Sequence, residues 1–107
     1  MIIVTITHHI RDGSLETALQ RIADNGTEMA AQPGFVFRHT GSPADAPLTV
    51  VTVTAWASRT DMDNWDALKK ARSAGADAGA SVYERVERLV IDVFDRRGSP
   101  SQTQGAA

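Results

Sequence analysis

The chain has 107 residues, the size of one domain, with 11 Lys and Arg against 13 Asp and Glu, a formal net charge of -2. This balance argues against the strongly basic surface of a nucleic-acid-binding protein. The absence of cysteine excludes disulfides, thiolate nucleophiles and cysteine-based zinc sites. The N-terminal residues have no signal-peptide pattern, and no apolar run reaches the ~20 residues that span a bilayer. We therefore expect a cytoplasmic protein that binds neither nucleic acid nor membrane.

A first strand is predicted over residues 2–10, which are rich in β-branched side chains. Side chains alternate between the two faces of a strand, so we expect one core-facing set and one mixed set. The core-facing set is Ile2, Val4, Ile6, His8 and Ile10, and the mixed set is Ile3, Thr5, Thr7 and His9. His8 and His9 therefore point to opposite faces and cannot form a metal-binding pair.

A long amphipathic helix is predicted next, with Ser14 as its N-cap and its end before Pro33. Gly26 lies inside this helix, where glycine costs roughly 1 kcal/mol relative to alanine. We expect either a kink or a close approach to the sheet at that position.

The rest of the domain repeats the alternation of strands and helix. We predict strands at residues 35–40, 48–56 and 82–94, with a loop at 41–47 and a weakly specified segment at 73–81. Ser58 and Asp61 match a capping box that opens the second helix. Residues 98–107 have no hydrophobic pattern, so we expect a domain over 1–97 and a disordered tail over 98–107.

The predicted order β-α-β-β-α-β is that of an α+β, ferredoxin-like fold. Its four-stranded antiparallel sheet carries both helices on one face. The opposite face includes Val51 and Val53, which a soluble monomer would rarely expose as part of one patch. A second copy of the same sheet would cover this face, so we expect a homodimer.

Three short motifs carry a family resemblance. They are Gln32-Pro33-Gly34-Phe35 after the first helix, Trp56-Ala57-Ser58 at the end of the third strand, and Trp65 on the second helix. In order and spacing, residues 1–95 resemble the antibiotic-biosynthesis-monooxygenase family. This resemblance implies a dimeric α/β barrel with the ligand held between helices and sheet in each protomer. It also implies one of several chemistries, including cofactor-free oxidation of phenols and degradation of haem.

The resemblance to the haem-degrading branch is incomplete. Trp65 matches the tryptophan that bends the haem, but the position of the axial histidine falls on Gly75. The asparagine of the first strand falls on Ile6 or Thr7. We therefore expect no cofactor, with haem as the alternative. In the phenol-oxidising branch Trp56 matches a substrate-holding tryptophan, and Asn64 is a nearby candidate for the asparagine.

The candidate site residues follow from this pattern. Trp56 and Trp65 could each be core packing or a wall for a flat aromatic ligand. His39 is the candidate general base, since alternation places it on one face with Phe35 and Phe37. Asn64 is the second catalytic candidate. The predicted substrate-binding residues are Trp56, Trp65, Phe37 and Arg72. Either Arg38 or Arg72 could hold an anionic group, and the alternative for both is a surface salt bridge.

The family resemblance, together with the two tryptophans, implies a cofactor-independent monooxygenase that oxidises a hydroquinone or polycyclic phenol with dioxygen. In such chemistry the protein deprotonates the phenol and holds the anion beside dioxygen, and the substrate supplies the electrons. Two alternatives stay open at this point, a haem-binding or haem-degrading protein and a non-catalytic ligand-binding module.

Overall fold

The structure is a computed structural model that describes residues 1–73 and 81–94. It has six elements in the predicted order: β1 (Ile2–Ile10), α1 (Leu15–Ala30), β2 (Phe35–Gly41), β3 (Thr49–Trp56), α2 (Arg59–Ser73) and β4 (Tyr83–Asp92). Each predicted element is therefore confirmed. The predicted tail at 98–107 and most of the weak segment at 73–81 lie outside the described residues.

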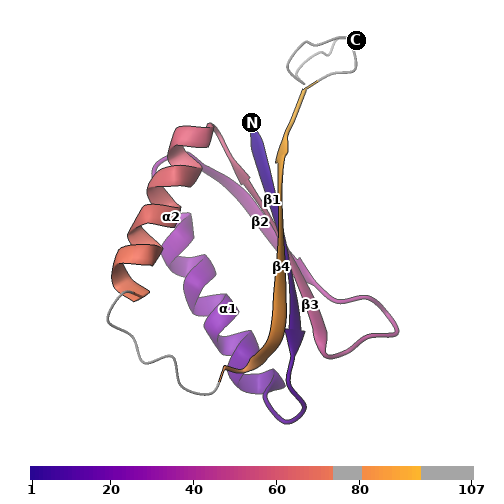
Figure 1. Cartoon of the computed structure of the whole chain (residues 1–107). Coiled ribbons are helices and arrows are strands. Elements are labelled where there is room, and N and C mark those ends of the chain that lie inside the picture. Colours follow the sequence, from indigo (N-terminus) through magenta and orange to yellow (C-terminus); the bar gives the residue numbers. More distant parts are fainter. Residues whose placement is uncertain (74–80, 95–107) are drawn as a thin grey trace.

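The four strands form one antiparallel sheet in the order β2-β3-β1-β4. Both helices cover the same face of this sheet, as Figure 1 shows. We call this the helix face and the opposite one the open face. In residues 1–73 and 81–94, no helix is long and apolar enough to cross a membrane.

The central strand β1 alternates as its sequence predicts. Four of its core-facing side chains, Ile2, Val4, His8 and Ile10, are buried on the helix face. Two hydrophobic clusters form along this face, one around Trp56 and Trp65 and the other around Ile22 and Val50. A histidine in such a row is the exception, because its neighbours in the row are all aliphatic.

Two local features lie just before β2 and at the start of α2. Gly34 has a φ of +83°, and the side chain of Asp61 fills the place where a Cβ would be. Any other residue at position 34 would meet both strain and a clash. One half of the predicted capping box is present, since the Asp61 N–H donates to Ser58 Oγ at 3.2 Å. The Asp61 carboxylate accepts from the Ser58 hydroxyl at 2.8 Å, where the full motif would have the Ser58 backbone N–H as donor.

Strand β2 contains an irregularity that simple alternation does not predict. Phe35 pairs with Trp56 and Phe37 pairs with Ala55, so the register shifts between the two phenylalanines. Phe35 therefore packs in the core on the helix face, whereas Phe37 and His39 lie on the open face with Ala55 and Val53. The expectation that His39 shares a face with Phe35 is wrong for this reason.

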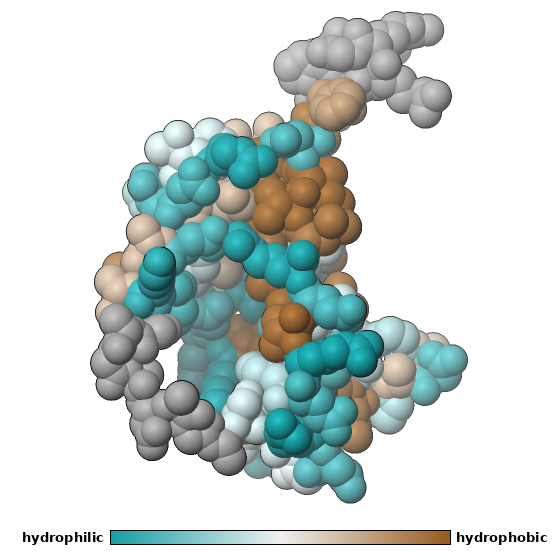
Figure 2. All heavy atoms as spheres, in the orientation of Figure 1, coloured by the Kyte–Doolittle hydropathy of each residue, from teal (hydrophilic) through white to brown (hydrophobic). Residues whose placement is uncertain are grey.

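The last strand keeps the predicted alternation. Val86 and Val90 pair with His8 and Val4 on the helix face. Leu89 and Ile91 pair with β1 residues of the open face, and they are 58% and 40% exposed. Figure 2 shows the hydrophobic patch that gathers over this part of β1 and β4.

Candidate functional site: a cavity between the helices and the sheet

A cavity of about 640 Å³ lies between α1, α2 and the helix face of the sheet. In Figure 2 the molecule is hollowed between the helices and β4. The lining residues come from all six elements: Ile6 and His8 (β1); Arg21, Ile22, Asp24, Asn25, Glu28 and Met29 (α1); Arg38 (β2); Thr52 and Thr54 (β3); Trp65 and Lys69 (α2); Tyr83 and Val86 (β4). A cavity of this size suits a small organic ligand.

His8 lies at one end of this cavity and is 8% exposed. Its ring Nδ1 is 3.0 Å from the carbonyl oxygen of Val50. A carbonyl can only accept, so Nδ1 carries the proton and Nε2 of the neutral ring has a free lone pair. Burial lowers the pKa of His8, the hydrogen bond to Val50 raises it in part, and the charge of Arg38 lowers it again. The ring is therefore neutral at pH 7 and able to accept a proton.

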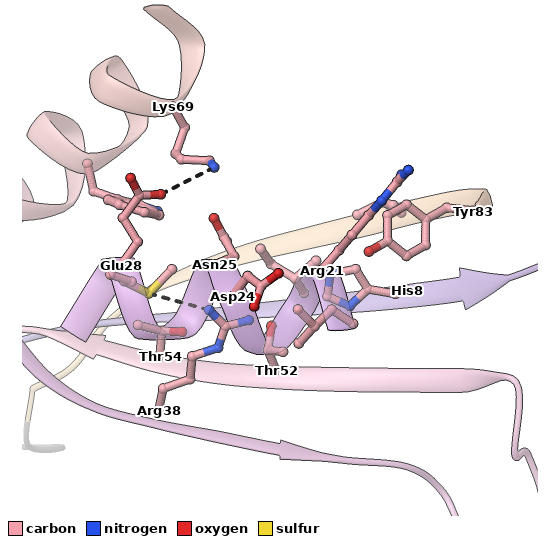
Figure 3. A pocket seen from close by; sticks show the side chains of 15 residues that line it. His8, Arg21, Asp24, Asn25, Glu28, Arg38, Thr52, Thr54, Lys69 and Tyr83 are labelled. Atoms are coloured by element: carbon pink, nitrogen blue, oxygen red, sulfur yellow. Dashed lines mark hydrogen bonds and ion pairs between the residues drawn. The ribbon is translucent and has the colours of Figure 1, made fainter. Parts of the chain in front are cut away.

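Tyr83 stands beside His8, with 5.2 Å between the ring centroids and 45° between the planes. Its hydroxyl points into the cavity in Figure 3. Burial raises the pKa of Tyr83, although the charges of Arg21 and Arg38 oppose the shift. The phenol therefore keeps its proton at neutral pH and can donate a hydrogen bond to a ligand oxygen.

Arg38 reaches across the cavity from β2 towards α1, between the two ends (Figure 3). Its guanidinium is half-buried, and its contact with Met29 is a weak one of 3.8 Å from Nη1 to Sδ. A Cβ added at Gly26 would lie 3.3 Å from Nη1 of Arg38. The close approach predicted at Gly26 is thus made by the Arg38 side chain. A second hollow of about 390 Å³ lies between α1 and β2, and Arg38 and Ile22 line both this hollow and the main cavity.

At the other end of the cavity, ion pairs connect the two helices. Glu28 of α1 forms ion pairs with Arg72 and, at 3.8 Å, with Lys69 of α2. The Lys69 ammonium also lies 5.5 Å from the ring centroid of Trp65. Between the two ends, the side-chain oxygen Oδ1 of Asn25 is buried and has no hydrogen-bond partner among the described residues.

The two tryptophans occupy different places. Trp65 is 6% exposed and lines the cavity, so it is both core and wall. Trp56 is 1% exposed and stands behind it, with ring centroids 6.3 Å apart. Trp56 also meets the edge of Phe35. A cluster of three aromatic rings, Trp65, Trp56 and Phe35, therefore packs behind this wall of the cavity.

The predicted site residues are only partly brought together. Trp65 lines the cavity, and Trp56 supports it from behind. Arg72 is exposed and engaged with Glu28. His39 and Phe37 lie on the open face, and Asn64 is exposed on α2. None of these last three is among the cavity residues of the described chain.

His8, Tyr83 and Arg38 make the polar centre of the cavity. Of these three, only Arg38 is a candidate from the sequence, as a residue that could hold an anionic group. The signal for His8 is a histidine in an otherwise aliphatic, core-facing row of a strand. The orientation of Arg38 towards the helices depends on the register shift in β2, which simple alternation does not predict. Over residues 1–73 and 81–94, no group of three or more His, Asp or Glu side chains is placed to hold a metal ion.

A family comparison agrees with the motifs. The family model for antibiotic biosynthesis monooxygenase matches residues 1–76, more than half of the chain. The chain belongs to this family. No curated protein sequence matches it at a significant level.

Solved structures of distant sequence share the fold. SnoaB, a cofactor-independent oxygenase from Streptomyces nogalater, is 16% identical with a TM-score of 0.70 over 88% of this chain and 93% of its own. MhuD, a haem degrader from Mycobacterium tuberculosis, is 22% identical with a TM-score of 0.65 over 85% and 94%. A protein from Shewanella oneidensis is 13% identical with a TM-score of 0.73 over 84% and 87%. At these identities the likeness concerns the fold.

Proposed function

We propose that this member of the family is a cofactor-independent monooxygenase that oxidises a flat, electron-rich phenol, such as a hydroquinone, with dioxygen. The observation that carries the proposal is a buried, neutral His8 whose Nε2 lone pair is free, inside a cavity walled by Trp65. The fold likeness to SnoaB, itself a cofactor-independent oxygenase, supports the same chemistry.

The first step is removal of the phenolic proton by His8 Nε2. A positioned base contributes typically ~10²–10⁴-fold to such a step. Phenols are weaker acids than the imidazolium, so the phenolate needs further stabilisation. The positive charge of Arg38 and the hydroxyl of Tyr83 are the groups of the cavity that can supply it.

The electrons for oxygen activation come from the substrate. One oxygen atom of dioxygen enters the ring and the other leaves as water, so a hydroquinone gives a hydroxyquinone and one water. Trp65 orients the flat ring, and contact with the lining side chains removes part of the hydration of the phenolate. The protein acts by deprotonation, orientation and electrostatic stabilisation.

Haem fits the cavity less well. The family position of the axial histidine holds Gly75, which has no side chain to offer. His9 and His39 lie on the open face, so His8 is the one histidine of the described residues that faces the cavity. Its ring is packed against Tyr83 and tied to Val50. We therefore assign no step to haem.

We further propose that the protein is a homodimer whose open faces pack together. The exposed Leu89 and Ile91 of β4 share that face with Ile3 of β1, which pairs with Ile91, and with Val53 of β3, and burying them would remove a hydrophobic patch from water. An interface on the order of 1,600 Å² or more would result.

Oxygen uptake tests the monooxygenase directly. Purified protein is mixed with a naphthalene diol or a simple hydroquinone in ¹⁸O-labelled dioxygen, and heat-denatured protein measures autoxidation. We expect faster uptake with the native protein and one labelled oxygen atom per product. Uptake equal to the denatured control across both substrates, with ligand binding intact, would favour a non-catalytic binding module instead. A sharp haem absorption band after addition of haemin would favour the haem alternative.

A further inference from the structure

The cavity holds a guanidinium whose charge no side chain of the described residues neutralises. Over residues 1–73 and 81–94, Arg38 forms no ion pair, and its polar contact is the weak one to the Met29 sulfur. Burial is the main cause that lowers the pKa of Arg38, but arginine stays charged at neutral pH. A half-buried, unpaired charge costs free energy unless a partner arrives.

Among the described residues, neither of the two carboxylates at the cavity, Asp24 and Glu28, forms an ion pair with Arg38. Asp24 Oδ1 accepts a hydrogen bond from Gln20 Nε2 at 2.8 Å along the exposed side of α1. Glu28 is held by Lys69 and Arg72 at the other end. Asp24 keeps its negative charge, but Arg21 and Arg38 outnumber it among the charged residues near this part of the cavity, which leaves a net positive charge there.

A glycine in α1 leaves room for the guanidinium of Arg38. Gly26 occupies the middle of α1, where glycine costs roughly 1 kcal/mol relative to alanine. A side chain there would press on Nη1 and the carbon of the Arg38 guanidinium, at 3.3 and 3.5 Å from a Cβ. The glycine thus keeps open the place where the charged group lies. Arg38 acts electrostatically on both His8 and Tyr83, so it belongs to the same site as those two residues.

We propose that Arg38 is a specificity-determining residue, which selects aromatic ligands carrying a carboxylate by pairing with that group. The inference deepens the proposed function, since it names the substrate class of the same cavity, but it is a statement about binding and does not require turnover. A guanidinium can form two parallel hydrogen bonds to one carboxylate. The carboxylate would anchor one end of the ligand while the ring lies against Trp65, with a phenolic oxygen left for His8 and Tyr83.

The test compares two ligands that differ only in the anion. Calorimetry measures the binding of 6-hydroxy-2-naphthoate and of 2-naphthol to the full chain. Fluorescence quenching in a Trp56→Phe background reports contact with Trp65, which lines the main cavity and not the second hollow. Hydrogen bonds to charged groups predict that the wild type prefers the naphthoate by about 10- to 100-fold.

Three variants separate the possible causes of that preference. Arg38→Gln should bring the two affinities within about 3-fold, whereas Arg21→Gln, a control that removes an exposed cation of the same cavity, should keep most of the preference. Gly26→Leu retains Arg38 but fills its place, and it should also abolish the preference. Circular dichroism confirms that each variant is folded, and Gly26→Leu remains an independent test if Arg38→Gln is not.

Several results would overturn the inference. These are equal affinity of the wild type for both ligands, no binding of either, or a preference that survives in Arg38→Gln and Gly26→Leu. Naphthoate binding without quenching of Trp65 would place the anion outside the main cavity and would equally overturn it. Absence of oxygen uptake with intact naphthoate selectivity would refute the proposed reaction while leaving the role of Arg38 standing.

Discussion

The two faces of the sheet use similar residue types for different purposes. On the helix face, His8 is buried, bonded to Val50 and set against Tyr83. On the open face, the next residue, His9, meets Glu87 at 2.7 Å near solvent. The bond from His9 is the main cause that lowers the pKa of Glu87. Adjacent histidines therefore have opposite environments, because a strand turns successive side chains to opposite faces.

The faces differ in the same way in their apolar residues. On the helix face, aromatic rings and aliphatic side chains close around a cavity that keeps polar groups at its centre. On the open face, Leu89 and Ile91 stand in a surface that nothing in the described chain covers. The proposed division of roles, with the ligand on the helix face and the interface on the open face, follows from this difference.

The largest effect is expected from removing the base. His8→Gln should lower kcat/KM for phenol oxidation by ~10²–10⁴-fold, because the amide cannot take the proton. Oxygen uptake measures the change. His39→Gln is the matched control, since it alters an exposed histidine of the open face and should keep the rate. A large loss in the His39 variant and none in the His8 variant would reverse the assignment.

A charge introduced into the hydrophobic patch of the open face tests the proposed dimer interface. Leu89→Lys should convert a dimer of twice 11.5 kDa into a monomer at micromolar concentration, because a desolvated lysine opposes the interface. Light scattering measures the mass. Leu19→Lys, at a 42%-exposed position of α1, is the control and should leave the mass unchanged. A wild-type protein that is already monomeric would contradict the dimer.

Much of the fold is predictable, and the site is less so, for a physical reason. The six elements follow from periodicity, a capping box and the Pro33-Gly34 turn, which are local signals. Local signals do not predict which β2 side chains face the helices. One shift of register between Phe35 and Phe37 reverses the orientation of every later side chain of the strand. That shift moves His39 out of the expected cavity and Arg38 into it.

Gly26 illustrates the intermediate case. Its helix-weakening effect is readable from the sequence and predicts either a kink or a close approach to the sheet, and the structure has the Arg38 side chain of β2 beside it. Which group approaches is a tertiary fact, since Arg38 is distant along the chain and its orientation depends on the register of β2. The cavity as a whole could not be predicted, because its lining comes from all six elements.

The pH dependence of stability offers a smaller, global test of the buried histidine. Burial lowers the pKa of His8 in the folded state, so the unfolded chain binds more protons between that value and its ordinary value of 6.5. The contribution of His8 to stability is thus complete above pH 6.5 and is lost as the pH falls through its folded pKa. Urea unfolding at several pH values should show a shallower decline in His8→Gln than in the wild type. Parallel curves would contradict a buried neutral His8.

The smallest expected effect separates the two tryptophans, and it decides whether the aromatic wall serves a ligand. Trp65→Phe should weaken the binding of a planar phenol by about 0.5–1.5 kcal/mol, the usual scale of an aromatic contact beyond simple burial. Phenylalanine is chosen because truncation of a buried tryptophan to alanine costs roughly 3–5 kcal/mol whatever its role.

Trp56→Phe is the matched control, since Trp56 is 1% exposed and does not line the cavity. It should lower the free energy of unfolding and leave ligand affinity nearly unchanged. Calorimetry gives the affinities, and urea unfolding gives the stabilities. Loss of stability in both variants with unchanged affinity in both would mean that Trp65 is core alone. In that event the cavity would lack its ring-binding wall, and the case for oxidation of an aromatic substrate would rest on His8 and Arg38 without a surface to orient the ring between them.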